Sequence, residues 1–188
     1  MERATRTVAV WIALSAMGIA LAPILWFPFL GTRAYPGQHM VNVLAGVMLG
    51  PLSSLVVPFV VGTVRIALGL GTIFAYPGGL PGALMVGLFH RYLTSRFSRP
   101  ELRFLSALAE PVGTVLIGGT VSLLVIGPLI GSEPLMNLLR GRGPVGALLV
   151  FWSGWAVSSV PGALLGYVLC LALSRALPER FFEPRASA

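Results

Sequence analysis

Lysine and aspartate are both missing from this chain, and it contains a single cysteine, Cys170. Without lysine there is no phosphate-binding Gly-x-x-x-x-Gly-Lys loop, so the chain cannot be its own ATPase. Without aspartate, a paired-aspartate intramembrane protease and a Ser-His-Asp triad are both excluded. There is also no His-Glu-x-x-His motif, and one cysteine cannot form an internal disulfide. We therefore expect no enzyme activity, no cofactor and no metal site in this chain.

Charge is also scarce. Charged residues make up 10% of the 188 positions and hydrophobic residues 56%, with a mean hydropathy of +0.88. This composition predicts an integral membrane protein. Thirteen arginines against six glutamates give a net charge of +7. A nucleic-acid-binding protein would gather these charges on one face, whereas here they punctuate apolar runs, so we expect the lipid bilayer and no nucleic acid as a partner.

The apolar runs predict an all-α integral membrane protein with one transmembrane domain over residues 1–188. The first run is followed by more membrane sequence, which argues against a cleaved signal peptide. Gly50-Pro51 divides the uncharged stretch 34–64. The depth of the short second helix stays open. Six transmembrane helices are expected, approximately at 8–30, 38–50, 52–69, 80–95, 104–128 and 145–174.

The arginines predict the orientation. Arg3 and Arg6 precede the first run, and the positive-inside rule places them in the cytoplasm. The cluster at 91–103 belongs on the same side, so an odd number of crossings separates it from residue 30, and three fit the length best. Both termini are then cytoplasmic. The inner side would also hold Arg91, Arg96, Arg99, Arg103, Arg175, Arg180 and Arg185, and the outer loops only Arg33, Arg140 and Arg142.

A polar group interrupts the second apolar run. Gln38, His39 and Asn42 place hydrogen-bonding side chains where hydrocarbon is otherwise found. Such groups are costly in a bilayer unless they face a cavity or each other, so they predict a ligand pocket. The loop 69–79 would lie at the same outer level and offers Phe74 and Tyr76 as stacking surfaces. Turn chemistry alone would also explain that loop.

Two charges fall inside the apolar region. Arg65 lies in the outer half of its predicted helix, where it could snorkel outward, donate to a ligand or brace the loop. Glu110 lies in the inner half of the fifth helix, and simple depth counting argues against a direct pair with Arg65. Glu110 could snorkel inward, cap a broken helix or bond to another helix. Trp152 and Trp155 could be interface anchors or an aromatic wall.

Small residues mark close helix contacts. The first helix carries alanines at three- and four-residue spacing, and pairs of glycines occur at 46/50 and 162/166. Such stripes let another helix approach closely. Packing within the chain and docking of a separate subunit are both open interpretations. The alanine stripe consists of Ala9, Ala13, Ala16 and Ala20.

Several motifs together resemble one family. They are Pro-Gly-Gln-His-Met-Val-Asn-Val-Leu-Ala-Gly-Val-Met-Leu-Gly-Pro at 36–51, Arg65, Gly-x-Gly-Thr-x-x-Ala-Tyr-Pro-Gly-Gly at 69–79 and Glu-Pro-Val-Gly-Thr at 110–114. With six helices and a small-residue first helix, they resemble ThiW, the substrate-binding S component of an energy-coupling-factor (ECF) vitamin transporter. The resemblance covers residues 8–130 by motif and the rest by topology.

The resemblance implies an S-component-like bundle in the plasma membrane of a prokaryote. Its partners would be an ECF T component and two cytoplasmic ATPase subunits that hydrolyse ATP, and the alanine stripe would slide on the T component. The substrate would be a thiamine precursor, with hydroxyethylthiazole as first candidate and thiamine or hydroxymethylpyrimidine as alternatives. A stand-alone facilitator and a scaffold subunit without a ligand remain open. A facilitator, however, should line a continuous polar path, and the inner helix halves show almost none.

A small neutral heteroaromatic alcohol fits the residues, because it needs aromatic faces and a few hydrogen-bond partners. A pyrophosphate would require several cations, and the outer side has few. The predicted substrate-binding residues are Gln38, His39, Asn42, Arg65, Thr72, Tyr76, Glu110, Thr114 and Trp152.

Overall fold

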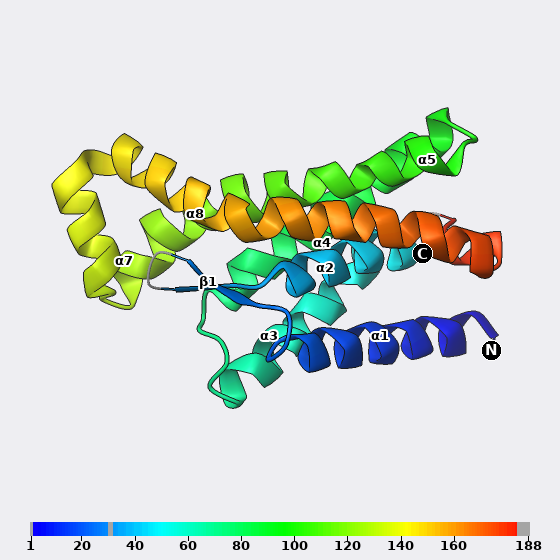
Figure 1. The fold of residues 1–188 in the computed structure, drawn as a ribbon, viewed down its shortest axis with the longest axis horizontal. Helices are drawn as coiled ribbons and strands as arrows, with labels where there is room; N and C mark the ends of the chain where they lie inside the picture. The colour runs from blue at the N-terminus through cyan, green and yellow to red at the C-terminus, as the bar shows by residue number, and fades with distance from the viewer. Residues whose placement is uncertain (1, 30–31, 184–188) are drawn as a thin grey trace.

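The computed structural model describes residues 2–29 and 32–183. It is a bundle of helices, and α8 runs along the length of the molecule (Figure 1). The first α1 residues and the end of α8 lie at the same end of the bundle (Figure 1). The first half of the chain forms α1 (Glu2–Leu21), β1 (Phe27–Phe29), β2 (Thr32–Ala34), α2 (Pro36–Leu49), η1 (Ser53–Leu55), α3 (Val56–Ala67) and α4 (Ala75–Arg96).

The second half contains two long helical segments. The first extends over Pro100–Leu129 and mixes α, 3-10 and π turns. The second is α8 (Glu133–Ala176), followed by η5 (Glu179–Phe181). The parts of the first segment are α5 (Pro100–Arg103), η2 (Phe104–Ala109), η3 (Val112–Gly118), α6 (Gly119–Val121), η4 (Ser122–Ile126) and α7 (Gly127–Leu129).

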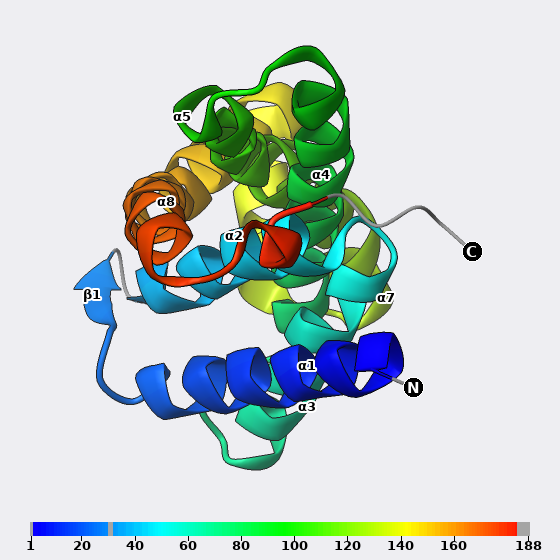
Figure 2. The same cartoon turned by 90° about the vertical axis from the view of Figure 1, so that its right-hand side faces the viewer.

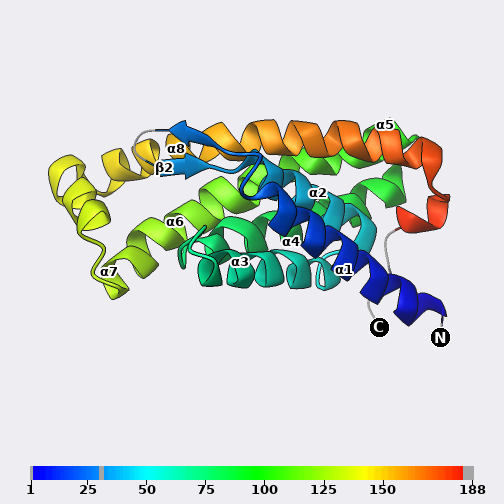
Figure 3. The same cartoon turned by 60° about the horizontal axis from the view of Figure 1, so that its bottom comes forward.

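The predicted first helix, 8–30, is wrong beyond Leu21, where α1 ends. Residues 27–34 instead contain two short antiparallel strands in which Phe27 pairs with Ala34. Pro23 and Pro28 explain the change, because proline disfavours helical geometry in the residue before it and donates no helix hydrogen bond. The hairpin lies beside α8 (Figure 3). The described fold is therefore helical except for this hairpin, while Leu30 and Arg185 lie outside the described residues.

Two more boundaries differ from the prediction. α4 begins at Ala75, so the last five residues of the predicted loop 69–79 are helical. Pro77 lies in the first turn, where a missing N–H leaves no bond unmade. α8 begins at residue 133 and not near 145, but Gly143 interrupts it with a φ of 66° and a ψ of 168°. A bend at this glycine (Figure 1) separates a short helix from a long one that matches the predicted 145–174.

α2 forms the centre of the bundle, with α1, α4 and α8 around it (Figure 2). Glycines allow these close contacts. A Cβ on Gly46 would lie 2.6 Å from Val86 Cβ on α4, and a Cβ on Gly166 of α8 would lie 2.6 Å from Val43 Cβ. Packing within the chain therefore accounts for these two predicted glycine positions. Gly50, with φ at 77°, ends α2 at the predicted Gly-Pro break.

The surface is rich in large apolar side chains. Ile24 is 75% exposed, Leu129 79% and Val145 72%. Among the described residues, three helices are long and apolar enough to cross a bilayer by length and composition, within Ala4–Leu21, Pro100–Leu129 and Glu133–Ala176. α2 has 14 residues, about 21 Å of helix, which is short of the roughly 30 Å hydrocarbon core. These features are those of a membrane protein.

Candidate functional site

A cleft of about 760 Å³ lies where the start of α2, the loop after α3 and the start of α4 meet the middle of α8. Tyr35, Gln38 and His39 line it from the first of these segments. The α8 lining residues include Phe151, Gly154, Trp155 and Ser158, whose spacing puts them on one face of the helix. The cleft therefore has polar groups on the α2 side and aromatic rings on the α8 side.

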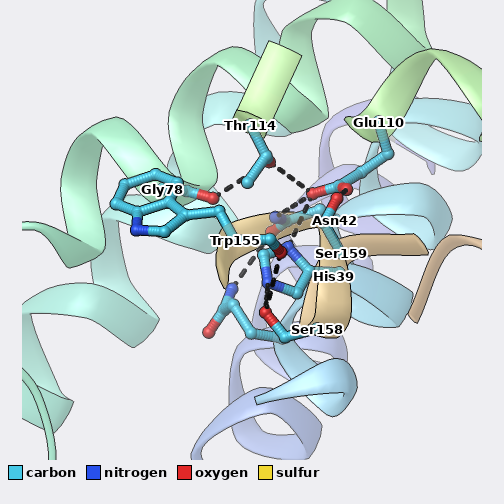
Figure 4. A network of polar contacts seen from close by, with 9 residues as sticks. His39, Asn42, Gly78, Glu110, Thr114, Trp155, Ser158 and Ser159 are labelled. Carbon is cyan, nitrogen blue, oxygen red and sulfur yellow. Dashed lines mark hydrogen bonds and ion pairs between the residues drawn. The ribbon is translucent and has the colours of Figure 1, made fainter. Parts of the chain in front are cut away.

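His39 lines the cleft and contacts the buried carboxylate of Glu110 (Figure 4). Its Nδ1 lies 2.9 Å from Glu110 Oε1, and its Nε2 lies 3.1 Å from the Ser158 hydroxyl oxygen. Because a carboxylate only accepts, Nδ1 carries the proton. In the neutral imidazole, Nε2 then accepts from Ser158 or from a ligand in the cleft. The hydrogen bond to Glu110 thus determines that the neutral His39 ring presents Nε2 as its hydrogen-bond acceptor.

Glu110 is completely buried and hydrogen-bonded on both oxygens. Asn42 Nδ2 donates to Oε1 at 3.1 Å, and the Thr114 hydroxyl lies 2.7 Å from the same atom. The Ser159 hydroxyl donates to Oε2 at 2.5 Å. Thr114 also lies 3.0 Å from the Gly78 carbonyl on α4. The carboxylate therefore joins α2, α8 and the Pro100–Leu129 segment beneath the cleft (Figure 4), and each donor compensates part of its desolvation.

Four of the nine predicted site residues line the cleft, namely Gln38, His39, Arg65 and Thr72. Three others, Asn42, Glu110 and Thr114, are fully buried below it. Gln38 links the two groups, because its Nε2 donates to Asn42 Oδ1 at 3.0 Å.

The depth predicted for Glu110 from the sequence differs from its place in the structure. The helical segment begins at Pro100 and not at 104, so Glu110 lies about 15 Å along its axis, level with His39. As expected from the sequence, Glu110 does not pair with Arg65; its partner is His39 Nδ1, which lies 2.9 Å from Oε1.

The remaining two predicted site residues, Tyr76 and Trp152, lie outside the cleft lining. The Tyr76 hydroxyl is 3.1 Å from Thr63 Oγ1, and its ring stacks on Phe59 with centroids 5.6 Å apart. Trp152 Nε1 donates to Thr120 Oγ1 at 3.1 Å. Both residues lie outside the lining because of their angular position on their helices. Once α4 starts at residue 75, positions 74, 75 and 78 face the cleft and 76 does not.

Sequence reasoning missed Tyr35, Ser158 and Ser159. The adjacent serines are the only signal for the latter two, since they place two hydroxyls together in the long apolar run 145–174. Trp155, one turn after Trp152, is the tryptophan that lines the cleft. Among the described residues no group of three or more His, Cys, Asp or Glu side chains could hold a metal ion.

Apolar helices around a cleft with a polar floor and an aromatic wall define a membrane protein that holds a small organic molecule. The family described as thiamine-precursor transporter protein (ThiW) matches residues 8–176, and the chain belongs to this family. The resemblance found in the motifs is thereby confirmed. Comparisons with curated proteins and with solved structures found no match.

Proposed function

We propose that this chain is the substrate-binding S component of an ECF-type transporter and that it captures hydroxyethylthiazole. Membership of a thiamine-precursor transporter family supports the class of substrate. The chain has no lysine and hence no Gly-x-x-x-x-Gly-Lys loop, so ATP hydrolysis would take place in two partner ATPases. In this proposal the chain crosses the plasma membrane of a prokaryote six times, with both termini in the cytoplasm.

The observation that carries the proposal is a cleft that ends on a hydrogen-bonded floor. Below His39, the core of α2 consists of apolar side chains such as Val43, Leu44 and Val47, which are at most 1% exposed. A facilitator needs a polar path through the bundle, and these residues fill the space that such a path would use. This packing favours capture of a ligand, followed by movement of the protein, over free passage.

The cleft chemistry suits a thiazole alcohol. His39 and Ser158 offer a hydrogen-bond acceptor and donor within 3.1 Å of each other. Phe74 and Trp155 border the same space and provide flat apolar surfaces for a heteroaromatic ring. A ligand with one ring and one hydroxyl can use both kinds of contact at once.

The alanine stripe on α1 supports a partner helix. Ala9, Ala13, Ala16 and Ala20 are all exposed in this chain. A smooth strip of small side chains lets another helix approach closely in a bilayer. We assign this face to the T component.

Binding to the purified protein tests the proposal. Isothermal titration with hydroxyethylthiazole, thiamine and hydroxymethylpyrimidine should give one-to-one binding that is tightest for the thiazole. His39→Ala should weaken it about tenfold, because one buried hydrogen bond and the Glu110 pairing are lost. Tyr76→Phe, outside the cleft, serves as the control and should leave affinity unchanged.

Two outcomes would contradict different parts of this proposal. If none of the three compounds binds, the S-component role fails. If thiamine or the pyrimidine binds more tightly than the thiazole, the role stands and the substrate is wrong.

A further inference from the structure

Arg65 is a buried cation in the wall of the cleft. It lies in the last turn of α3, is only 6% exposed, and still lines the cleft. Its guanidinium lies over the Tyr35 ring, 3.9 Å from the centroid. Its Nη2 makes one long hydrogen bond, 3.4 Å, to the Leu70 carbonyl. That carbonyl also accepts from the Tyr35 hydroxyl at 3.0 Å, so the contact with Arg65 is a weak one.

Among the residues that the structure describes, no carboxylate compensates this charge. Within the described part of the chain, Glu110 pairs with His39 and Glu179 with Arg103, and no glutamate forms an ion pair with Arg65. Arg65 Nε is buried without any hydrogen-bond partner. Burying an unpaired cation is costly, and the cost falls when an anion occupies the adjoining space. An anion bound in the cleft beside Arg65 would therefore lower the cost of burying this cation.

The loop after α3 brings backbone amides to the same wall of the cleft. The loop that follows α3 contributes Gly69, Gly71 and Thr72 to the cleft lining, and Gly69 has φ at 70°. In the described chain, neither the Gly71 nor the Thr72 amide has a backbone acceptor. α4 starts three residues later, and its first turn borders the cleft as well. The Gly71 and Thr72 amides favour an anion, which is a second contribution in the same direction as Arg65, whereas the α4 amides of Ala75, Tyr76 and Gly78 already donate to backbone carbonyls.

We propose that Arg65 and the 69–72 loop form an anion subsite, and that the cleft accepts the phosphate monoester of the thiazole alcohol. This inference rests on the proposed function. The phosphate would lie at Arg65 and the ring toward Trp155. A phosphate monoester carries up to two charges and three acceptor oxygens, which one guanidinium and two amides can satisfy. A pyrophosphate would need more cations than this wall contains.

The test compares two ligands on matched variants. Hydroxyethylthiazole and its phosphate are titrated into wild type, Arg65→Gln and Arg140→Gln, with folding checked by thermal melting in detergent. Arg140 is exposed, so its replacement removes the same charge away from the cleft. Wild type and Arg140→Gln should bind the ester about tenfold more tightly than the alcohol, and Arg65→Gln should lose that preference. The ratio of the two affinities is the readout, because a general weakening of the loop would lower both equally.

Each possible result supports or overturns the anion subsite or the proposed function. The inference is overturned if wild type binds the alcohol but not the ester, or if Arg65→Gln weakens both ligands by the same factor; the proposed function then remains. If only the ester binds, the anion subsite is supported and the neutral alcohol is excluded as the substrate. Binding of neither overturns the proposed function itself. If Arg65→Gln does not fold, competition by inorganic phosphate against the ester on wild type replaces it, with displacement as the supporting result and its absence as the opposing one.

Discussion

Glu110 is the residue on which the floor of the cleft depends. Donors from α2, α8 and its own helix converge on its two oxygens, so the carboxylate fixes three segments in one arrangement. It also holds His39 in one orientation. We therefore regard Glu110 as a positioning residue, with His39 as the group that a ligand would touch.

Replacing Glu110 tests this role. Glu110→Leu leaves His39, Asn42 and Ser159 without their acceptor, and buried donors without partners are strongly destabilising. We expect the free energy of unfolding, measured in detergent micelles, to fall by about 3–5 kcal/mol. Glu133→Gln is the control, because Glu133 is exposed and should change stability by less than about 0.5 kcal/mol. Equal stability of the two variants would show that the network contributes little.

At the scale of elements, glycine positions set how closely the helices pack. Sequence spacing predicted the pairs 46/50 and 162/166, and the structure assigns them different tasks. Gly46 and Gly166 face neighbouring helices, and Gly50 ends α2. Gly162 lies against the Pro36 carbonyl and His39, which brings α8 and its serines next to the start of α2. Close backbone approach, and not helix propensity, thus positions the site.

Gly46→Ala should test this packing. The added methyl would lie 2.6 Å from two Val86 carbons and 2.9 Å from the Ala83 carbonyl, so α2 and α4 must separate. We expect a loss of about 1–3 kcal/mol of unfolding free energy, measured in the same micelles. Gly154→Ala on α8 is the matched control, since its methyl would meet nothing within 4 Å, and it should not lower stability. A similar loss in both variants would point to backbone effects instead of packing.

For the whole molecule, the cleft and the alanine face of α1 are separate surfaces. None of the α1 side chains that the structure describes lines the cleft. The proposed transport cycle therefore predicts that partner docking can be blocked without loss of ligand binding.

Ala13→Trp is the variant that separates these functions. A bulky ring in the alanine stripe prevents close approach of a T-component helix. Uptake of labelled thiazole by cells expressing the full transporter should fall at least about tenfold, while the purified chain keeps its affinity. Leu165→Trp, on an exposed position of α8, is the control and should transport normally. Unchanged uptake by Ala13→Trp would remove α1 from the docking surface.

Composition and pattern alone determined the class of this protein. Three features are visible in the sequence without tertiary information: the charge content is too low for a soluble domain, the apolar runs have helical length, and polar residues stand at 38, 39 and 42. They are visible because hydration and hydrogen bonding act on each residue locally. Motifs were enough to find the family. The sequence also predicted the break at Gly50-Pro51, since both residues act on the backbone where they stand.

Only the tertiary structure decided which side chains meet. His39 and Ser158 are 119 positions apart, and His39 and Glu110 are 71 apart, so no local pattern links them. The starting points of two helices decided where the other predicted site residues lie. Tyr76 lies outside the cleft lining because α4 starts at residue 75. Glu110 reaches His39 because its helical segment starts at Pro100. A side chain's direction and depth depend on where its helix begins and what packs against it, and these are properties of the folded chain.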